Sequence, residues 1–496
     1  MTEFVRRFGR HRRRKSPARN SSGRSEWHGW GIVVVLAAHL SIALLDGLLR
    51  GIGVFFLSWR DDFDSSAQAT AAVSSILTSV YSFSVLLGGV MTKHCGCRTT
   101  GIFGGMLTSV GIFSSHWVKE IYQLYIAAAV LGVGQGVAFN AVTVAVAMHF
   151  KSQFKTAYAV AYAGGGVGGI AIPPLLQLLL EAYGWRGAML VISAIAANLI
   201  GLSALCRPPR SERCLHAANT LEVQMRSSFD ESVADGSNMR SEDHSVSDAD
   251  FPEVGESGGE RPANSTTDDF TEIDSIKTGS KSVKLTHPLR GFASAVGLDL
   301  FVKSYRFTLV CLSTIELGFA SYGCSQFIIP RAESTGVAPS STALLLSMYG
   351  VGLLVGRLGN GLLIVCRMSA ETASGFCLSM AGVSLLLMNV DSYVSMALAT
   401  FTQGLTSGAI YTIFIVQIRH YVGLEHFGVA VGLNCIFNGI GGLCGPLISG
   451  LLYDVTGSYK TIFYLLAGVY FAGALQTLFF PLLKRLEPGV ENTEHR

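Results

Sequence analysis

The chain has 496 residues, of which 49% are hydrophobic and only 14% charged, and its mean hydropathy is +0.42. This composition excludes an ordinary soluble domain, which needs charged side chains over its whole surface. The formal net charge of +3 conceals a strongly basic start and an acidic middle. We therefore predict an all-α integral membrane protein with several spans.

Residues 1–29 form a basic arm that contains the run RRFGRHRRRK at Arg6–Lys15. Such a run can resemble a nucleic-acid patch, but beside a first apolar span it more often marks the cytoplasmic side. The first apolar segment is too long for a cleavable signal peptide and lacks a small-residue cleavage site. The cysteines show no metal-ligand spacing. We expect no nucleic-acid partner, no metal and no cofactor.

Twelve apolar segments follow, each near the ~20 residues that a bilayer requires. Six lie in a first half, 30–206, at approximately Trp30–Leu57, Gln68–Met91, Thr99–Ser115, Tyr122–Met148, Thr156–Tyr183 and Gly187–Cys206. Six lie in a second half, 304–484, at approximately Phe307–Pro330, Leu344–Cys366, Ala370–Met388, Met396–Ile418, Phe427–Tyr453 and Thr461–Leu483. The sequence thus predicts two six-helix bundles.

A linker, 207–303, separates the two halves, and a short tail, 485–496, ends the chain. The core of the linker, Ser227–Ser275, is rich in Ser, Asp, Glu and Gly, and cannot bury enough apolar area to fold. We expect a disordered cytoplasmic loop. Its serines lie beside acidic residues and are candidates for phosphorylation, although compositional bias alone produces the same pattern.

Basic residues between the segments fall on one side of the membrane if the spans alternate. They occur in the arm, in the turns Lys93–Arg98 and Lys151–Lys155, at Arg367 and Arg419, and at Lys484–Arg485. The positive-inside rule then places both termini in the cytoplasm. Trp59, Trp117 and Trp185 all come at the opposite face, where we expect their indole rings to lie among lipid headgroups.

Arg357 stands near the middle of the apolar run LLLSMYGVGLLVGRLGNGLLIV, Leu344–Val365. A charge there costs several kcal/mol in hydrocarbon, so we expect it to face a polar path and bind a ligand. Its guanidinium stays ionised and can hold a carboxylate through two hydrogen bonds. The sequence therefore predicts a solute transporter in which Arg357 binds a carboxylate. The alternative is a permanent ion pair that only holds helices together.

Other polar residues lie at similar depth. Asp46 and Arg50 are four residues apart and so share one helix face. Arg50 could supply fixed positive charge to the substrate, or the two could neutralise each other as a gate or a structural pair. Glu316 could exchange a proton, or fill a helix interface in its protonated form. Tyr411 and Asn438 are candidates for lining the cavity, with interhelical hydrogen bonding as the alternative.

Several motifs resemble the monocarboxylate transporter family of the major facilitator superfamily. They are Gly96-Cys97-Arg98 after the second span, Phe150, Ala157, Ala161, Ala163, Gly164 and Gly168 around the fifth, Tyr183-Gly184-Trp185-Arg186 before the sixth, and Gly445-Pro446, Asp454 and Gly457 near the end. The resemblance covers both halves and implies the major facilitator fold, in which two halves rock about a central site. Independently, the spacing of Ala157, Ala161 and Gly165 predicts one smooth ridge for helix packing.

The resemblance also implies roles for single residues. In proton-coupled members an arginine of the eighth helix contacts the substrate carboxylate, and Arg357 aligns with it. Those members carry a lysine where Arg50 falls and an aspartate where Leu353 stands. Because arginine cannot release a proton at physiological pH and the aspartate is missing, strict proton symport is in doubt.

We therefore expect a plasma-membrane transporter of small monocarboxylates or carboxylate-bearing solutes. One alternative is a pH-independent facilitator of a creatine-like zwitterion, and another is a non-transporting receptor or scaffold. The chain contains no nucleophile constellation or phosphate-binding loop, so an enzyme is not expected. Some family members travel with a single-span glycoprotein, and the resemblance permits such a partner here.

Overall fold

A computed structural model describes residues 29–150, 153–207, 300–365 and 368–487. Most of the predicted basic arm, linker and tail lies outside these residues. Within them, all regular secondary structure is helical and no strand occurs. The predicted all-α class is confirmed.

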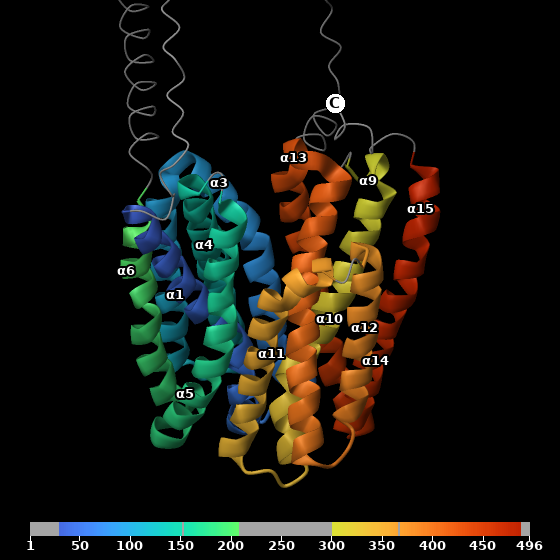
Figure 1. The fold of residues 1–496 in the computed structure, drawn as a ribbon. Helices are drawn as coiled ribbons and strands as arrows, with labels where there is room; N and C mark the ends of the chain where they lie inside the picture. The colour runs from blue at the N-terminus through green and yellow to red at the C-terminus, as the bar shows by residue number, and fades with distance from the viewer. Residues whose placement is uncertain (1–28, 151–152, 208–299, 366–367, 488–496) are drawn as a thin grey trace, which may run out of the picture. The chain divides into compact units, whose positions relative to one another are not determined.

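The first half begins with a helix that continues, through a short 3-10 turn, into a second one. Its elements are α1 (Trp30–Gly51), η1 (Ile52–Phe55), α2 (Phe56–Asp62), α3 (Ala67–Ser114), η2 (Ser115–Trp117), α4 (Ile121–His149), α5 (Phe154–Ala196) and α6 (Asn198–Leu205) (Figure 1). The second half contains α9 (Leu300–Lys303), α10 (Tyr305–Glu333), α11 (Pro339–Val365), α12 (Ala370–Leu387), α13 (Tyr393–Thr456), α14 (Tyr459–Gln476), η3 (Thr477–Phe479) and α15 (Phe480–Leu486).

Three long helices contain a sharp break at a glycine. Gly96 in α3, Gly184 in α5 and Gly423 in α13 have φ values of 80°, 64° and 77°, a backbone conformation that favours glycine. Nine helical stretches of the described residues are long and apolar enough to cross a bilayer. Dividing α3, α5 and α13 at their breaks gives segments that fit the twelve predicted spans.

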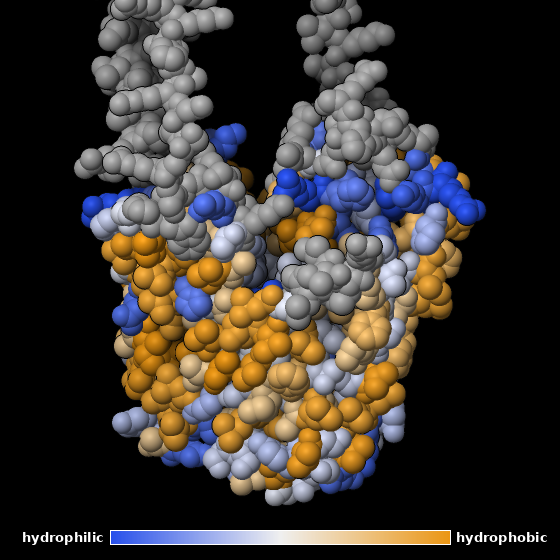
Figure 2. Space-filling view, viewed as in Figure 1, coloured by the Kyte–Doolittle hydropathy of each residue, from blue (hydrophilic) through white to orange (hydrophobic). Residues whose placement is uncertain are grey.

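The surface agrees with a membrane environment. Figure 2 shows hydrophobic side chains gathered over the sides of the helices and hydrophilic ones toward their ends. Large apolar side chains such as Leu40, Ile126 and Leu178 are 52%, 64% and 63% exposed. Outward-facing apolar side chains of this kind suit contact with lipid tails rather than water.

The two halves meet through α3 with α13 and through α5 with α11. Gly169 lies against Gly350, and Ser347 Oγ donates a hydrogen bond of 2.9 Å to the carbonyl oxygen of Ile170. Thr78 Oγ1 donates one of 3.0 Å to the carbonyl oxygen of Gly442. Small residues and polar side chains are what membrane helices use to associate, because lipid tails are as apolar as leucine.

The predicted ridge on α5 lies at a helix interface. Ala157 and Ala161 are buried, and Gly165 lies directly against a side chain of α1. Further along, a Cβ atom on Gly168 would collide with the backbone of Ala43 on α1. This face of α5 therefore lets α1 approach closely.

The prediction that three tryptophans lie among headgroups is wrong for two of them. Trp117 is 58% exposed, but Trp59 and Trp185 are only 1% and 6% exposed. Their ring centroids are 6.4 Å apart in an edge-on arrangement. Because α2 and the second part of α5 bring the two indoles together, they bury each other instead of facing lipid.

Candidate functional site

Arg357 of α11 forms an ion pair with Asp46 of α1. Its Nη2 atom lies 3.2 Å from Asp46 Oδ2, and the two side chains are 9% and 12% exposed. Its Nη1 atom donates a hydrogen bond of 2.6 Å to the carbonyl oxygen of Tyr162 on α5. The guanidinium also lies 5.0 Å from the centre of the Tyr162 ring. Arg357 thus connects its own half to two helices of the other half.

The Arg357–Asp46 pair relates to the two roles predicted for Arg357, which were substrate binding and a permanent ion pair. The charge at depth in α11 is held by an acidic side chain in the described conformation, as the ion-pair alternative for Arg357 proposed. Asp46 pairs with Arg357 rather than with Arg50, although Arg50 is its neighbour on the helix. A pair that joins two halves of a molecule can be structural, or it can be the group that a substrate separates.

Gly165 of α5 makes room for this pair. A Cβ atom at this position would collide with Asp46 Oδ2 and with Arg357 Nη1. Any larger residue would displace one of the two charged groups, because the clash is with the interacting atoms themselves. The ion pair therefore depends on the absence of a side chain on α5.

Arg50 of α1 is surrounded by tyrosines. Its Nη1 atom donates a hydrogen bond of 2.9 Å to the hydroxyl of Tyr349 on α11, and the guanidinium lies 5.0 Å from the ring centre of the same residue. The ring centre of Tyr322 on α10 is 6.0 Å away. Arg50 is only 6% exposed. It has no ion pair among the residues that the structure describes.

Tyr411 and Asn438 lie close together, as a shared cavity lining requires. Asn438 Nδ2 donates a hydrogen bond of 3.0 Å to the Tyr411 hydroxyl. Both belong to α13, on opposite sides of its break at Gly423. The predicted alternative of interhelical bonding is therefore observed between these two segments. Asn438 Oδ1 is nevertheless buried without a hydrogen-bond partner.

Glu316 is not brought to the charged pair. Its carboxylate lies against Gly473 of α14, with Leu378 of α12 also beside that glycine. Glu316 Oε2 is buried and has no hydrogen-bond partner. Leu353, where the resemblance places an aspartate in proton-coupled relatives, is fully buried with its backbone against Gly404 and Gly408 of α13.

The sequence reasoning missed the tyrosines that surround the two arginines. Tyr162, Tyr322 and Tyr349 all lie inside apolar helices, but Tyr162 and Tyr322 meet the arginines through their rings, and of the three hydroxyls only that of Tyr349 bonds to one. A buried hydroxyl needs a polar partner. That requirement was the available signal. It shows that a partner exists, but the sequence does not say which residue it is.

Some buried polar atoms have no partner in the described part of the chain. They include Arg50 Nε, Arg357 Nε and both amide atoms of Gln135. Buried polar groups are normally hydrogen-bonded, so these atoms keep hydrogen-bonding capacity that no described residue uses. The described residues contain no group of three or more His, Cys, Asp or Glu side chains that could hold a metal ion.

Two helical bundles that share buried charges at their interface are typical of a membrane transporter. The family model described as Major Facilitator Superfamily matches residues 38–242 and 310–496. The chain belongs to this superfamily. It is a multi-pass membrane transporter and not an enzyme.

Curated relatives narrow this assignment. The chain is 26% identical to monocarboxylate transporter 12 of Homo sapiens, over 96% of this chain and 86% of that one. It is 27% identical to monocarboxylate transporter 13 of Bos taurus, with 91% and 89% covered, and 26% identical to monocarboxylate transporter 14 of Homo sapiens, with 92% of each covered. The resemblance to monocarboxylate transporters is confirmed.

Solved structures share the fold. A peptide transporter POT in complex with sulfate matches with a TM-score of 0.64 and 12% identity, covering 93% of this chain and 96% of that one. The nucleoside transporter NupG matches with a TM-score of 0.60 and 12% identity, covering 91% and 99%. At this identity the likeness supports the predicted major facilitator fold alone.

Proposed function

We propose that the protein transports small monocarboxylates, or other carboxylate-bearing solutes, by alternating access. Arg357 holds the carboxylate and Arg50 assists. The observation that carries this proposal is the buried Arg357–Asp46 pair between α11 and α1. A guanidinium held by a carboxylate of the protein can hold a carboxylate of a substrate in the same way.

The pair gives a mechanism for coupling binding to movement. A substrate carboxylate that takes the place of Asp46 on Arg357 keeps the buried arginine neutralised while it frees α1 from α11. Without substrate, separating the pair leaves two unpaired buried charges, which is strongly unfavourable. Substrate therefore lowers the cost of the rearrangement, because only Asp46 is left unpaired instead of both charges.

Contacts between the halves favour a conformation that is closed at one end. The Asp454 carboxylate, near the end of α13, accepts hydrogen bonds of 2.9 and 2.8 Å from the backbone N–H groups of Ala67 and Gln68 at the start of α3. Ser347, near the start of α11, bonds to Ile170 of α5. We assign this end to the outside, with both termini in the cytoplasm and the protein in the plasma membrane.

A second candidate substrate class is a zwitterion. Asp46 is freed when a carboxylate binds Arg357, and it then offers a negative partner for an ammonium or guanidinium group on the same solute. This favours a creatine-like substrate moved without a proton. A receptor that does not transport has less need of charges buried at an interface between moving halves, because such charges are costly.

The test is uptake of labelled lactate, pyruvate, creatine and an aromatic amino acid into expressing cells at two external pH values. Arg357→Gln should abolish uptake of the transported solute. Arg186→Gln is the matched control, because Arg186 pairs with Asp62 at 2.9 Å but both side chains are about 40% exposed. Uptake that is unchanged in Arg357→Gln would refute the role of Arg357.

The same assay addresses proton coupling. If Glu316 carries the proton, uptake rises at acid pH and Glu316→Gln flattens that dependence. Uptake that does not respond to pH favours the facilitator. If no solute enters although the protein is at the cell surface, the result supports the alternative of a non-transporting receptor. The single-span glycoprotein partner stays a prediction.

A further inference from the structure

Arg50 is a buried cation whose direct contacts are neutral, although Asp46 lies one turn away on the same helix. The hydroxyl and ring of Tyr349 and the ring of Tyr322 surround its guanidinium. Hydrogen bonding and cation–π attraction lower the cost of burying a cation but leave its charge in place. An anion that reaches Arg50 therefore meets a guanidinium that no carboxylate contacts directly, because Asp46 pairs with Arg357 instead.

Tyr349 is built to hold one orientation of Arg50. The residue is 1% exposed, so its ring has little freedom to turn. Its hydroxyl accepts from Arg50 Nη1 and shares a second hydrogen bond of 3.2 Å with Ser321 Oγ on α10. With the Tyr349 oxygen fixed on one side, the position of the guanidinium is fixed as well. Arg50 Nε has no partner and is free to donate.

We propose that Tyr349 is a positioning residue, which holds Arg50 ready for the substrate carboxylate without neutralising it. The inference rests on the proposed transport of carboxylate-bearing solutes. It assigns the hydroxyl of Tyr349, rather than a second acidic residue, the task of presenting the arginine. An acidic residue there would compete with the substrate, whereas a tyrosine does not.

The free-energy cost of binding a substrate carboxylate then differs between Arg357 and Arg50. A carboxylate on Arg357 must displace Asp46, which pairs with it at 3.2 Å. A carboxylate on Arg50 displaces no ionised group, because Tyr349 can stay in place while Nε and the remaining N–H groups donate. The substrate is therefore expected to engage Arg50 first and to compete with Asp46 afterwards.

Tyr349 also connects binding to the second half. Arg50 belongs to α1, whereas Tyr349 and Ser321 belong to α11 and α10. A shift of Arg50 away from Tyr349 strains its hydrogen bond to α11, and Tyr349 is itself bonded to Ser321 on α10. Loss of the hydroxyl leaves the guanidinium without the group that fixes its position, so it should weaken substrate binding.

The experiment compares uptake kinetics of wild type, Tyr349→Phe and Tyr470→Phe, each corrected for surface protein. The probe is whichever of labelled lactate, pyruvate or creatine the wild type transports. Tyr470→Phe is the matched control: this tyrosine is fully buried in the same half and its hydroxyl accepts a hydrogen bond of 2.6 Å from Gln403. We expect Tyr349→Phe to raise KM about tenfold with Vmax within about twofold, and Tyr470→Phe to leave KM unchanged.

Equal KM values in Tyr349→Phe and wild type would overturn the inference while transport itself stands. A wild type that moves none of the probes would overturn the proposed function and this inference with it. If Tyr349→Phe does not reach the cell surface, Ser321→Ala removes only the hydroxyl that holds Tyr349. A smaller rise in KM is expected there, and an unchanged KM would refute the positioning role.

Discussion

The carboxylate of Asp46 and the guanidinium of Arg357 meet at 3.2 Å although 311 positions separate them in the chain. Neither charge is tolerable alone at this depth, since an unpaired buried ion costs several kcal/mol. The pair therefore joins α1 to α11 in the described conformation. It also defines what a substrate must offer, namely a group that replaces one of the two partners.

Replacing Asp46 distinguishes the two substrate classes. In Asp46→Asn, a carboxylate no longer competes with an acidic side chain for Arg357, so KM for lactate or pyruvate should fall severalfold. A zwitterion loses the partner of its cationic end, and its KM should rise about tenfold, since a hydrogen bond to a charged group contributes about 1.5–3 kcal/mol. Initial uptake rates across substrate concentrations measure both effects.

The control for this variant is Asp62→Asn, which removes the acidic member of the exposed Arg186 pair. It should change neither KM, because exposed ion pairs contribute little. Asp46→Asn also leaves Arg357 unpaired, so surface levels must be measured alongside uptake. An unchanged KM for every transported solute would show that Asp46 does not compete at the binding site.

Gly165→Ala tests whether the charged pair needs the gap in α5. The added methyl group would occupy the position of Asp46 Oδ2 and Arg357 Nη1, so one of them must move. Such overpacking typically costs about 1–3 kcal/mol. We expect uptake to fall by about tenfold or more at normal surface expression.

The matched control is Gly468→Ala in α14, where a Cβ atom would meet nothing within 4 Å. This variant should transport like wild type, because alanine is favoured over glycine in a helix. If Gly165→Ala also transports normally, the contact between α5 and the pair has no functional importance.

Hydropathy was enough to predict the class of fold, and the position of Arg357 inside a span was enough to predict that it has a polar partner or ligand. The length of each apolar run sets the number of spans, and a charge inside a span must have a partner. The identity of the partner could not be predicted. Asp46 was weighed as a partner of Arg50, four residues away on its own helix, but it pairs with Arg357 across the interface.

The same limit explains the tryptophans and Glu316. Depth in the membrane follows from position along a span, whereas the direction that a side chain faces depends on which helix packs beside it. Trp59 and Trp185 were expected among lipid headgroups, but they face each other. Glu316 was expected at a depth like that of Arg357, but it lies against Gly473. A single sequence does not show which of its helices pack against one another.

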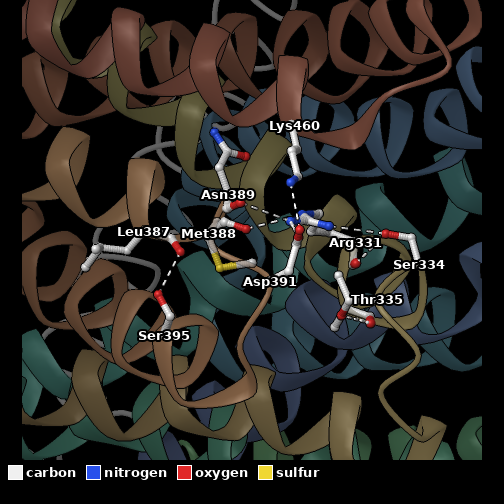
Figure 3. A network of polar contacts seen from close by, with 10 residues as sticks. Arg331, Ser334, Thr335, Leu387, Met388, Asn389, Asp391, Ser395 and Lys460 are labelled. Carbon is white, nitrogen blue, oxygen red and sulfur yellow. Dashed lines mark hydrogen bonds and ion pairs between the residues drawn. The ribbon is translucent and has the colours of Figure 1, made fainter.

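Asp391, in the loop between α12 and α13, gives a prediction about pH. It accepts from Lys460 Nζ at 2.8 Å and pairs with the buried Arg331, whose other contacts include the carbonyl oxygens of Met388 and Asn389 (Figure 3). Hydrogen bonds from Lys460 and Arg331 hold the pKa of Asp391 below its ordinary value. A lowered folded-state pKa adds stability that is fully present above the ordinary pKa of about 3.9 and is lost as pH falls through the lowered value.

Asp391→Asn should therefore lower the unfolding temperature of the purified full chain by the same amount at every pH from 8 to 5. The difference from wild type should shrink only below about pH 4. Thermal unfolding at pH 8, 6, 5, 4 and 3 checks this. A difference that already shrinks between pH 7 and pH 5 would mean that another group titrates in this network. Any pH dependence of uptake between 6 and 7.5 should be identical in Asp391→Asn and wild type.

Asp454 of α13 joins the two halves at one end by capping the first turn of α3. The first N–H groups of α3 have no partner within their own helix, and a carboxylate from α13 accepts from two of them. Losing such a cap costs about 1 kcal/mol, which should shift the conformational equilibrium toward opening at this end by about fivefold.

A cysteine introduced at Ser347, which is 5% exposed, reports this opening through its rate of modification by an impermeant thiol reagent added outside. Asp454→Ala should raise that rate about fivefold and Asp454→Asn by less, because asparagine keeps one acceptor but loses the charge. The single variants without the new cysteine control for native thiols, and labelling rates that match in all backgrounds would show that Asp454 does not hold the halves together.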